Sequence, residues 1–331
     1  MNTNILGVYL GHNSNAALVS NGELIAAVEE ERFSRKKNND GMKTGPIESI
    51  KYCLQSCNYK VDEIAFGLEL PQVLQQQAIN SYVHSINNGF AERIKCIKIY
   101  NNDNLTPHQV FTYPFAWQKS KIDQLISEIS SCGLNTDIPF NYVNHHLAHA
   151  SSAYFKSPFD DCLIITLDGM GDDLCGFVGI GEKGLIKEID KTNYIHSIGI
   201  LYSIITEICG FKPIRHEGKI TGLSASGQPC QKLINELDKI TYTNNGKWYS
   251  SLDKDNKLGP YPHILRQENC KYLINILQSI KTKWKIEDVA ASVQKYFENQ
   301  ITSFIDFHMK SLSKSSLVLA GGVFANVKLN Q

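Results

Sequence analysis

The sequence has no excess of charge of either sign and no long apolar run. Its 331 residues include 33 Lys+Arg and 33 Asp+Glu, so the overall charge does not favour nucleic acid or an anionic membrane as a partner. No apolar stretch approaches the roughly 20 residues needed to span a bilayer, and the N-terminus lacks the basic segment and apolar core of a secretory signal. We therefore expect a cytoplasmic protein.

The cysteines also lack a recognisable pattern. There are nine of them, an odd number, and none forms the CxxC pair that is typical of zinc sites and redox motifs. Buried thiols in a reducing compartment account for them best. A chain of this length can form two domains of ordinary size or one large duplicated unit.

A strand, polar loop, strand, turn, strand pattern occurs twice. The first copy has GHNSN as its polar loop and the Asn21-Gly22 hairpin turn, and the second has DGMGDD as its loop. This repetition predicts an α/β protein with internal duplication, in which residues 1–150 and 151–331 form two halves. A Gln- and Asn-rich stretch at about 68–131 is predicted to be an insertion in the first half. The predicted strands are 4–10, 16–19, 23–28, 162–167, 175–180 and 185–189.

Further elements follow from the same reasoning. Pro46 is expected as the first residue of a helix, and later helices are expected over residues 198–209 and 287–308. Between those helices, EGKITGLSASG is predicted to be a glycine-rich loop followed by a polar stretch. A strand at 316–319 then leads into AGGVFANVKLNQ. Domains seldom end one turn into a helix, so we expect a truncated chain or one half of a split protein.

Three histidines lie close together in VNHHLAHASSAYF, residues 143–155. On a helix, His145 and His149 are about 40° apart and His146 and His149 about 60° apart, so either pair could bind one metal ion. The alternative is that one histidine caps the helix and another is an ordinary polar residue. The apolar strand before this segment and the Asp168 loop after it favour a metal site.

Two polar loops follow buried strands. Asp168 begins DGMGD, where glycine allows backbone amides to approach a phosphate and a carboxylate can face a cation, although such a loop is often a plain β-turn. His12 lies in the matching first loop. It is a candidate general base near neutral pH, or a turn residue bonded to its own loop.

Three weaker signals remain. The segment Glu217-Gly218-Lys219 could hold a phosphate or form a solvated turn, and Gly321-Gly322 with Asn326 could contact a nucleotide or form a simple turn. In EEERFSRKK, Lys36 and Lys37 could point to an anionic or hydroxylated ligand, although a solvated face explains most of this run.

Six segments of the sequence, taken in order, relate these separate motifs to one family. They resemble the O-carbamoyltransferases of nodulation-factor and antibiotic biosynthesis, and the resemblance runs from Asn4 to Gln331 except for the insertion. The segments are LGHNSNAALVSNGELIAAVEEERFSRKK, VNHHLAHASSAYFKSPF, LIITLDGMGD, IGILYSIITEICGFKPIRHEGKITGL, DVAASVQKYFENQ and LVLAGGVFANVKLN.

The resemblance implies a duplicated actin/sugar-kinase-like (ASKHA) domain with ribonuclease-H-like halves, here incomplete at its C-terminus. In the family, a C-terminal YrdC-like domain makes carbamoyl-adenylate from ATP and carbamoyl phosphate, and this domain is expected to be absent from the chain. The large domain then transfers the carbamoyl group to a hydroxyl of a small sugar or antibiotic-like acceptor. The chain alone is therefore expected not to use ATP and carbamoyl phosphate.

The resemblance also implies roles for individual residues. His145 and His149 match the histidine ligands of an Fe²⁺ site, or of another divalent transition metal, and His12 matches the catalytic base. Lys37 matches the acceptor side. In the family, an aspartate from a motif beyond the Gly-Gly strand completes the metal site, and this chain ends before that motif. The residues that match the carbamoyl-adenylate pocket are Asp168, Gly169, Gly171, Asp172, Glu217, Gly218, Lys219, Gly321, Gly322 and Asn326.

Two other functions are compatible with the sequence. The chain could be a catalytically incomplete fragment that binds a nucleotide or a partner chain, such as a separate C-terminal half. It could also be a phosphotransferase of the same superfamily, such as a sugar or acetate kinase. The histidine pair disfavours a kinase, because Mg²⁺ prefers oxygen ligands.

Overall fold

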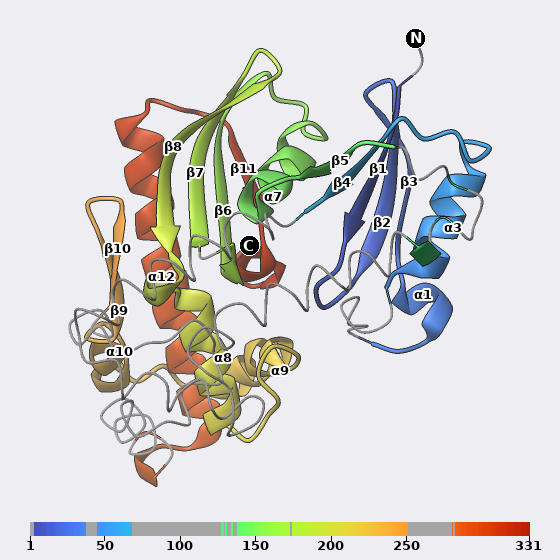
Figure 1. Ribbon diagram of the computed structural model, residues 1–331. Coiled ribbons are helices and arrows are strands. Elements are labelled where there is room, and N and C mark those ends of the chain that lie inside the picture. Colours follow the sequence, from blue (N-terminus) through green and yellow to red (C-terminus); the bar gives the residue numbers. More distant parts are fainter. Residues whose placement is uncertain are drawn as a thin grey trace, which may run out of the picture. The chain divides into compact units, whose positions relative to one another are not determined.

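The computed structural model describes residues 3–37, 45–67, 127–128, 130, 134, 138–172, 174–250, 280 and 282–331. The chain divides into two compact units, Met1–His145 and His146–Gln331, and each contains one mixed sheet (Figure 1). The division falls at the first residue of a helix, α7 (His145–Tyr154). The predicted insertion at 68–131 lies outside the described residues, apart from 127, 128 and 130.

The first unit is built on a five-stranded sheet in the order β3-β2-β1-β4-β5. Strands β1, β2 and β3 form an antiparallel meander, and β4 and β5 run parallel to β1. These strands are β1 (Asn4–Tyr9), β2 (Asn15–Ser20), β3 (Glu23–Glu29), β4 (Glu63–Phe66) and β5 (Phe140–Tyr142).

Two helices follow the meander of the first unit, namely α1 (Glu31–Ser34) and α3 (Ile47–Gln55). The apolar residues that alternate along β1, β2 and β4 pack with the buried side of α3, in one core that includes Leu6, Leu18 and Ile50. Pro46 precedes the first helical residue of α3, so its expected position was wrong by one residue.

The second unit contains a four-stranded sheet in the order β11-β6-β7-β8. Strands β6, β7 and β8 form an antiparallel meander, and β11 runs parallel to β6. Over four strands, this sheet therefore has the same order and directions as β4-β1-β2-β3 of the first unit. The predicted repetition of the strand pattern is confirmed. These strands are β6 (Asp161–Gly171), β7 (Leu174–Glu182), β8 (Leu185–Asn193) and β11 (Leu317–Ala320).

Strand β6 is buried on both of its faces. Leu163, Ile165 and Leu167 pack into a core with residues of α8 (Ile198–Ile208) and α12 (Ile286–Ser311). Cys162 and Ile164 pack on the other face, with Ala150 and Tyr154 of α7. This arrangement explains why the sequence of β6 is a continuous apolar run and not an alternating one. Helices α8 and α12 confirm the helices predicted over 198–209 and 287–308.

Two predictions for the second unit were wrong. The segment expected as a glycine-rich loop begins with a helix, α9 (Glu217–Leu223), because the fully buried Ile220 anchors it in the core in spite of its two glycines. The polar stretch also contains regular structure. The remaining elements are η1 (Tyr194–His196), η2 (Ser224–Ser226), α10 (Gln231–Leu237), β9 (Thr241–Asn244), β10 (Lys247–Ser250) and the 3₁₀ turn η5 (Gly322–Ala325).

The described cysteines are free thiols, and four of these six are buried. Burial is also the main reason why the pKa of the Cys53 thiol is raised to about 11, which keeps it protonated and unreactive at neutral pH. In the described part of the chain, no helix is long and apolar enough to cross a membrane.

Because His308 is buried, we expect the protein to be less stable toward unfolding in mild acid. Its Nε2 donates to the main-chain oxygen of Gly246 at 3.0 Å, which holds the β9–β10 turn against α12, and burial lowers the pKa of His308 from 6.5. The unfolded chain therefore binds more protons, so stability should decrease as the pH falls below about 6.5.

Urea unfolding at pH 7.5 and pH 5.5 tests this expectation. His308→Gln keeps a donor for Gly246 and removes the titrating ring, so it should lessen the acid-induced decrease in the free energy of unfolding. An equal decrease in both proteins would contradict this explanation.

Candidate metal centre and its surroundings

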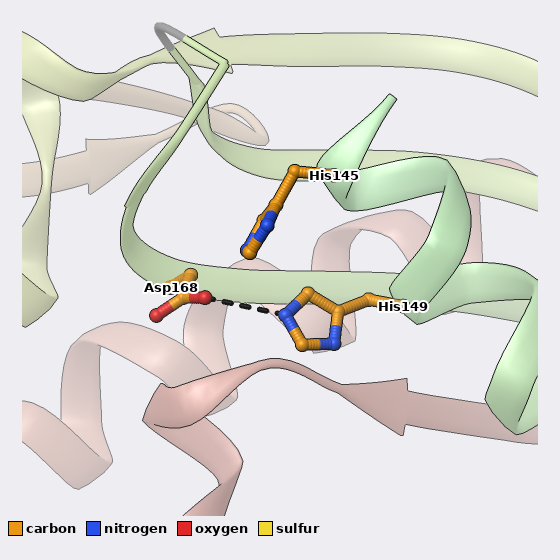
Figure 2. A group of neighbouring side chains, drawn as sticks. All are labelled: His145, His149 and Asp168. Atoms are coloured by element: carbon orange, nitrogen blue, oxygen red, sulfur yellow. Dashed lines mark hydrogen bonds and ion pairs between the residues drawn. The ribbon is translucent and has the colours of Figure 1, made fainter. Parts of the chain in front are cut away.

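His145, His149 and Asp168 form a compact group of possible metal ligands. His145 begins α7, His149 lies one turn later, and Asp168 follows the buried part of β6. One ligand atom from each residue can be chosen so that all three lie within 4.8 Å of one another. Figure 2 shows the two rings and the carboxylate pointing toward one another. The distance between His149 Nε2 and Asp168 Oδ2 is 3.3 Å.

This group fits a divalent transition-metal ion in its donor set. Two imidazole nitrogens and one carboxylate oxygen are typical ligands of non-haem Fe²⁺ and are also common around zinc. His145 is buried, whereas the side chains of His149 and Asp168 keep 32% and 22% of their surface exposed. Solvent can therefore reach a group that is held by a helix and a strand.

His146 points elsewhere, although its spacing from His149 also suits a metal site. Its ring is fully buried, and its Nδ1 lies 2.6 Å from the hydroxyl oxygen of Thr166 on β6. The geometry therefore places His145, and not His146, in the group with His149 and Asp168. Helical spacing alone left this choice open, because it does not show which side of α7 faces β6.

Asp168 lies beside both histidines. The sequence indicated that this carboxylate could face a cation, and the resemblance placed it in the adenylate pocket, which stays a prediction. The resemblance also led us to expect that an aspartate from a motif beyond the chain completes the metal site, whereas the structure places a carboxylate of this chain in the group.

Several contacts fix Asp168 in this position. Its Oδ1 accepts a hydrogen bond from the backbone nitrogen of Gly169 at 2.7 Å. The Ser197 hydroxyl donates to the main-chain oxygen of Asp168 at 3.1 Å and also caps the N-terminus of α8 through Ile200. Sequence reasoning did not find Ser197, because a serine before a helix is usually only a cap.

The glycine turn after β11 lies against the same part of β6. A Cβ atom on Gly321 would come within 2.3 Å of the Leu167 oxygen, and the φ angle of +97° also favours glycine there. A Cβ atom on Gly322 would lie 2.9 Å from Asp168 Oδ1. The structure therefore brings Gly321 and Gly322 together with Asp168.

Gly322→Ala is expected to weaken metal binding about tenfold. The added Cβ atom would push against Asp168 Oδ1 and reorient this carboxylate. The measurement is a titration of the metal-free protein with Fe²⁺ under anaerobic conditions. Gly222→Ala is the matched control, since its Cβ would meet no atom within 4 Å. Equal affinities in the two variants would show that the contact at Gly322 does not position Asp168.

The remaining residues that were predicted to bind the adenylate include one that is held by hydrogen bonds and two that are exposed. The Glu217 carboxylate accepts hydrogen bonds from the Ser203 hydroxyl at 2.5 Å and the Ile214 backbone nitrogen at 2.6 Å, so it anchors the start of α9. Gly218 and Lys219 are exposed on α9, and Lys219 Nζ lies 5.5 Å from the centre of the Phe211 ring.

Asn326 joins the segment after β11 to α9. Its Nδ2 donates to the Thr221 hydroxyl at 3.3 Å, and its Oδ1 accepts from the backbone nitrogens of Lys328 and Leu329. Gly171 pairs with Leu174 at the end of the β6–β7 hairpin. Asp172 forms the turn with a φ angle of 51°, so these two residues belong to a β-turn.

His12 and Lys37 belong to the first unit. His12 lies in the turn between β1 and β2, where its exposed ring has Nδ1 3.4 Å from Asn13 Oδ1. Asn13 has a φ angle of 61°, a conformation that asparagine and aspartate adopt more readily than other non-glycine residues. Lys37 is exposed beyond α1.

Comparison with known families decides the assignment of the chain. The family model described as Carbamoyltransferase N-terminus matches residues 4–331. The chain belongs to this carbamoyltransferase family. The match extends through both units and includes the histidine helix, β6 and the glycine turn after β11.

Relatives of the chain occur in several organisms. An uncharacterised protein of Synechocystis sp. is 27% identical over 99% of this chain and 52% of its own length. An uncharacterised protein of Methanocaldococcus jannaschii is 30% identical over 98% of this chain and 52% of its own length. The nodulation protein NolNO of Sinorhizobium fredii is 27% identical over 96% of this chain and 42% of its own length. The chain thus spans about half the length of the curated relatives it matches.

Proposed function

We propose that this chain is the carbamoyl-transferring part of an O-carbamoyltransferase. It would bind carbamoyl-adenylate, made from ATP and carbamoyl phosphate, and transfer the carbamoyl group to a hydroxyl of a small sugar or antibiotic-like acceptor. The observation that carries this proposal is the group of His145, His149 and Asp168 beside the glycine turn, in a chain of the carbamoyltransferase N-terminus family.

The two sheets of the chain support a duplicated architecture for the proposed transferase. The two sheets share the order and directions of four strands. We propose that they are the ribonuclease-H-like halves of a duplicated actin/sugar-kinase-like domain. In the second half, Asp168 and Gly322 lie together, and backbone amides at such glycines suit the anionic phosphate of an adenylate.

His145, His149 and Asp168 would hold Fe²⁺ or another divalent transition metal. Such an ion supplies a Lewis acid, which polarises a carbonyl group or neutralises phosphate oxygens. The residues of the chain add rigidity to this site. Asp168 is fixed through Gly169 and Ser197, so the carboxylate is already oriented before an ion binds.

His12 would act as the general base. The acceptor oxygen forms a bond to the carbamoyl carbon while the bond from that carbon to the adenylate phosphate breaks. The hydroxyl proton passes to the imidazole of His12, and AMP leaves as an anion. An exposed imidazole in a turn can accept this proton without displacing core residues. The exposed Lys37 would contact the acceptor.

A transfer assay tests the proposal. The protein is supplied with carbamoyl-adenylate and a panel of hydroxyl compounds, and AMP release and carbamoyl ester formation are measured by mass spectrometry. We expect ester formation that depends on the acceptor and on a divalent metal. Binding of AMP without ester formation from any acceptor would favour the alternative, a nucleotide- or partner-binding fragment.

A further inference from the structure

Gln294 is a buried polar residue in the middle of α12 that uses its full hydrogen-bonding capacity. Its side chain is completely buried. The Nε2 atom donates to Glu298 Oε1 at 2.9 Å and to Asn326 Oδ1 at 3.1 Å. The Oε1 atom accepts from the Tyr202 hydroxyl at 2.9 Å and from Asn326 Nδ2 at 2.9 Å. An amide group has two donor hydrogens and two acceptor positions, so none is left unused.

The bonds of Gln294 connect three other parts of the second unit. Tyr202 lies on α8, and its hydroxyl also lies 3.0 Å from that of Thr221 on α9. Asn326 ends the glycine turn after β11 and donates to the same Thr221 hydroxyl. Gln294 therefore ties the glycine turn, α8 and α9 together from inside the unit.

The elements that Gln294 connects also carry the proposed adenylate site. Helix α9 bears Glu217, Gly218 and Lys219, and the turn after β11 bears Gly321, Gly322 and Asn326. The N-terminal cap of α8 holds Asp168 in place.

The buried network around Gln294 is stable only when each of its polar groups has a hydrogen-bond partner. A buried amide costs free energy unless its donors and acceptors find partners. The Tyr202 hydroxyl is kept neutral in the same environment, because burial raises its pKa to about 12. A network in which each group satisfies another fixes one relative placement of the joined elements.

We propose that Gln294 is a positioning residue for adenylate binding. It holds Asn326 and the glycine turn in register with α9, without touching the ligand itself. This inference rests on the proposed function, since it assigns the positioning of the same adenylate site.

Isothermal titration of the full chain with AMP tests the inference. Gln294→Met keeps the length of the side chain and removes all four hydrogen bonds, and we expect it to bind AMP at least about tenfold more weakly than the wild type, the equivalent of one net hydrogen bond. Gln294→Glu keeps an acceptor for Tyr202 and Asn326 but loses both donations, to Glu298 and to Asn326, and places a second carboxylate beside Glu298, so it should also bind AMP more weakly than the wild type. This second variant decides the matter if Gln294→Met does not fold.

Gln300→Met is the matched control on the same helix. Gln300 accepts from the Thr243 backbone nitrogen at 2.7 Å and donates to Asp238 at 2.9 Å, and neither partner belongs to the proposed site. Both methionine variants should lower the unfolding temperature, but only Gln294→Met should weaken AMP binding.

The possible outcomes separate this inference from the proposed function. A folded Gln294 variant that binds AMP as tightly as the wild type would overturn the positioning role. Equal weakening in Gln300→Met would also overturn it, because the effect would then follow stability. Failure of the wild-type chain to bind AMP would instead overturn the adenylate function, and the positioning role with it.

Discussion

His149→Ala is expected to lose most of the metal that the wild-type chain binds, with an affinity decrease of about 100-fold or more. The variant removes one of three ligands, whereas loss of a mere outer contact already costs about 10- to 100-fold in metal affinity. Only His145 and Asp168 would remain in the group. The measurement is the iron content of protein purified anaerobically, followed by titration of the metal-free protein.

His146→Gln provides the matched control for this experiment. It replaces the neighbouring histidine of α7, whose ring contacts Thr166 and does not belong to the metal-binding group. We expect this variant to keep its metal even if it is less stable. A loss of metal in His146→Gln as large as that in His149→Ala would move the assignment to the pair of His146 and His149, and retention of metal by His149→Ala would exclude both pairs.

His12→Ala is expected to lower the rate of carbamoyl transfer by about 10²- to 10⁴-fold, the usual contribution of a general base. Because His12 lies in a turn of the first unit and is exposed, its removal should leave metal content and AMP affinity unchanged. The measurement is the single-turnover rate of ester formation from carbamoyl-adenylate. Full activity in His12→Ala would exclude this residue as the base.

Much of the fold could be predicted from the sequence. Apolar runs bounded by turn residues located β1, β2, β3 and the meander of the second unit, because local turn chemistry sets where strands end. Helix α9 was missed for the opposite reason. Its two glycines disfavour a helix, and the packing of Ile220 that overcomes them comes from residues far away in the sequence.

The candidate site was predictable in its residue types but not in its grouping. Spacing on a helix limited the candidate ligands to two pairs of histidines, and only the packing of α7 on β6 distinguished His145 from His146. Likewise, the sequence of DGMGD did not show whether Asp168 faces a phosphate or the histidines. The network around Gln294 was not predictable, because its members lie 92 and 32 positions from Gln294 along the chain.

The burial of β6 on both faces would couple the proposed metal binding to the stability of the second unit. The strand that ends at the Asp168 region packs into two apolar cores, so its backbone amides should be among the last to exchange with deuterium. An ion that binds only the folded unit raises the free energy needed to open this strand. By the same linkage, a substitution that destabilises β6 far from Asp168 should lower the apparent affinity of the protein for the metal ion.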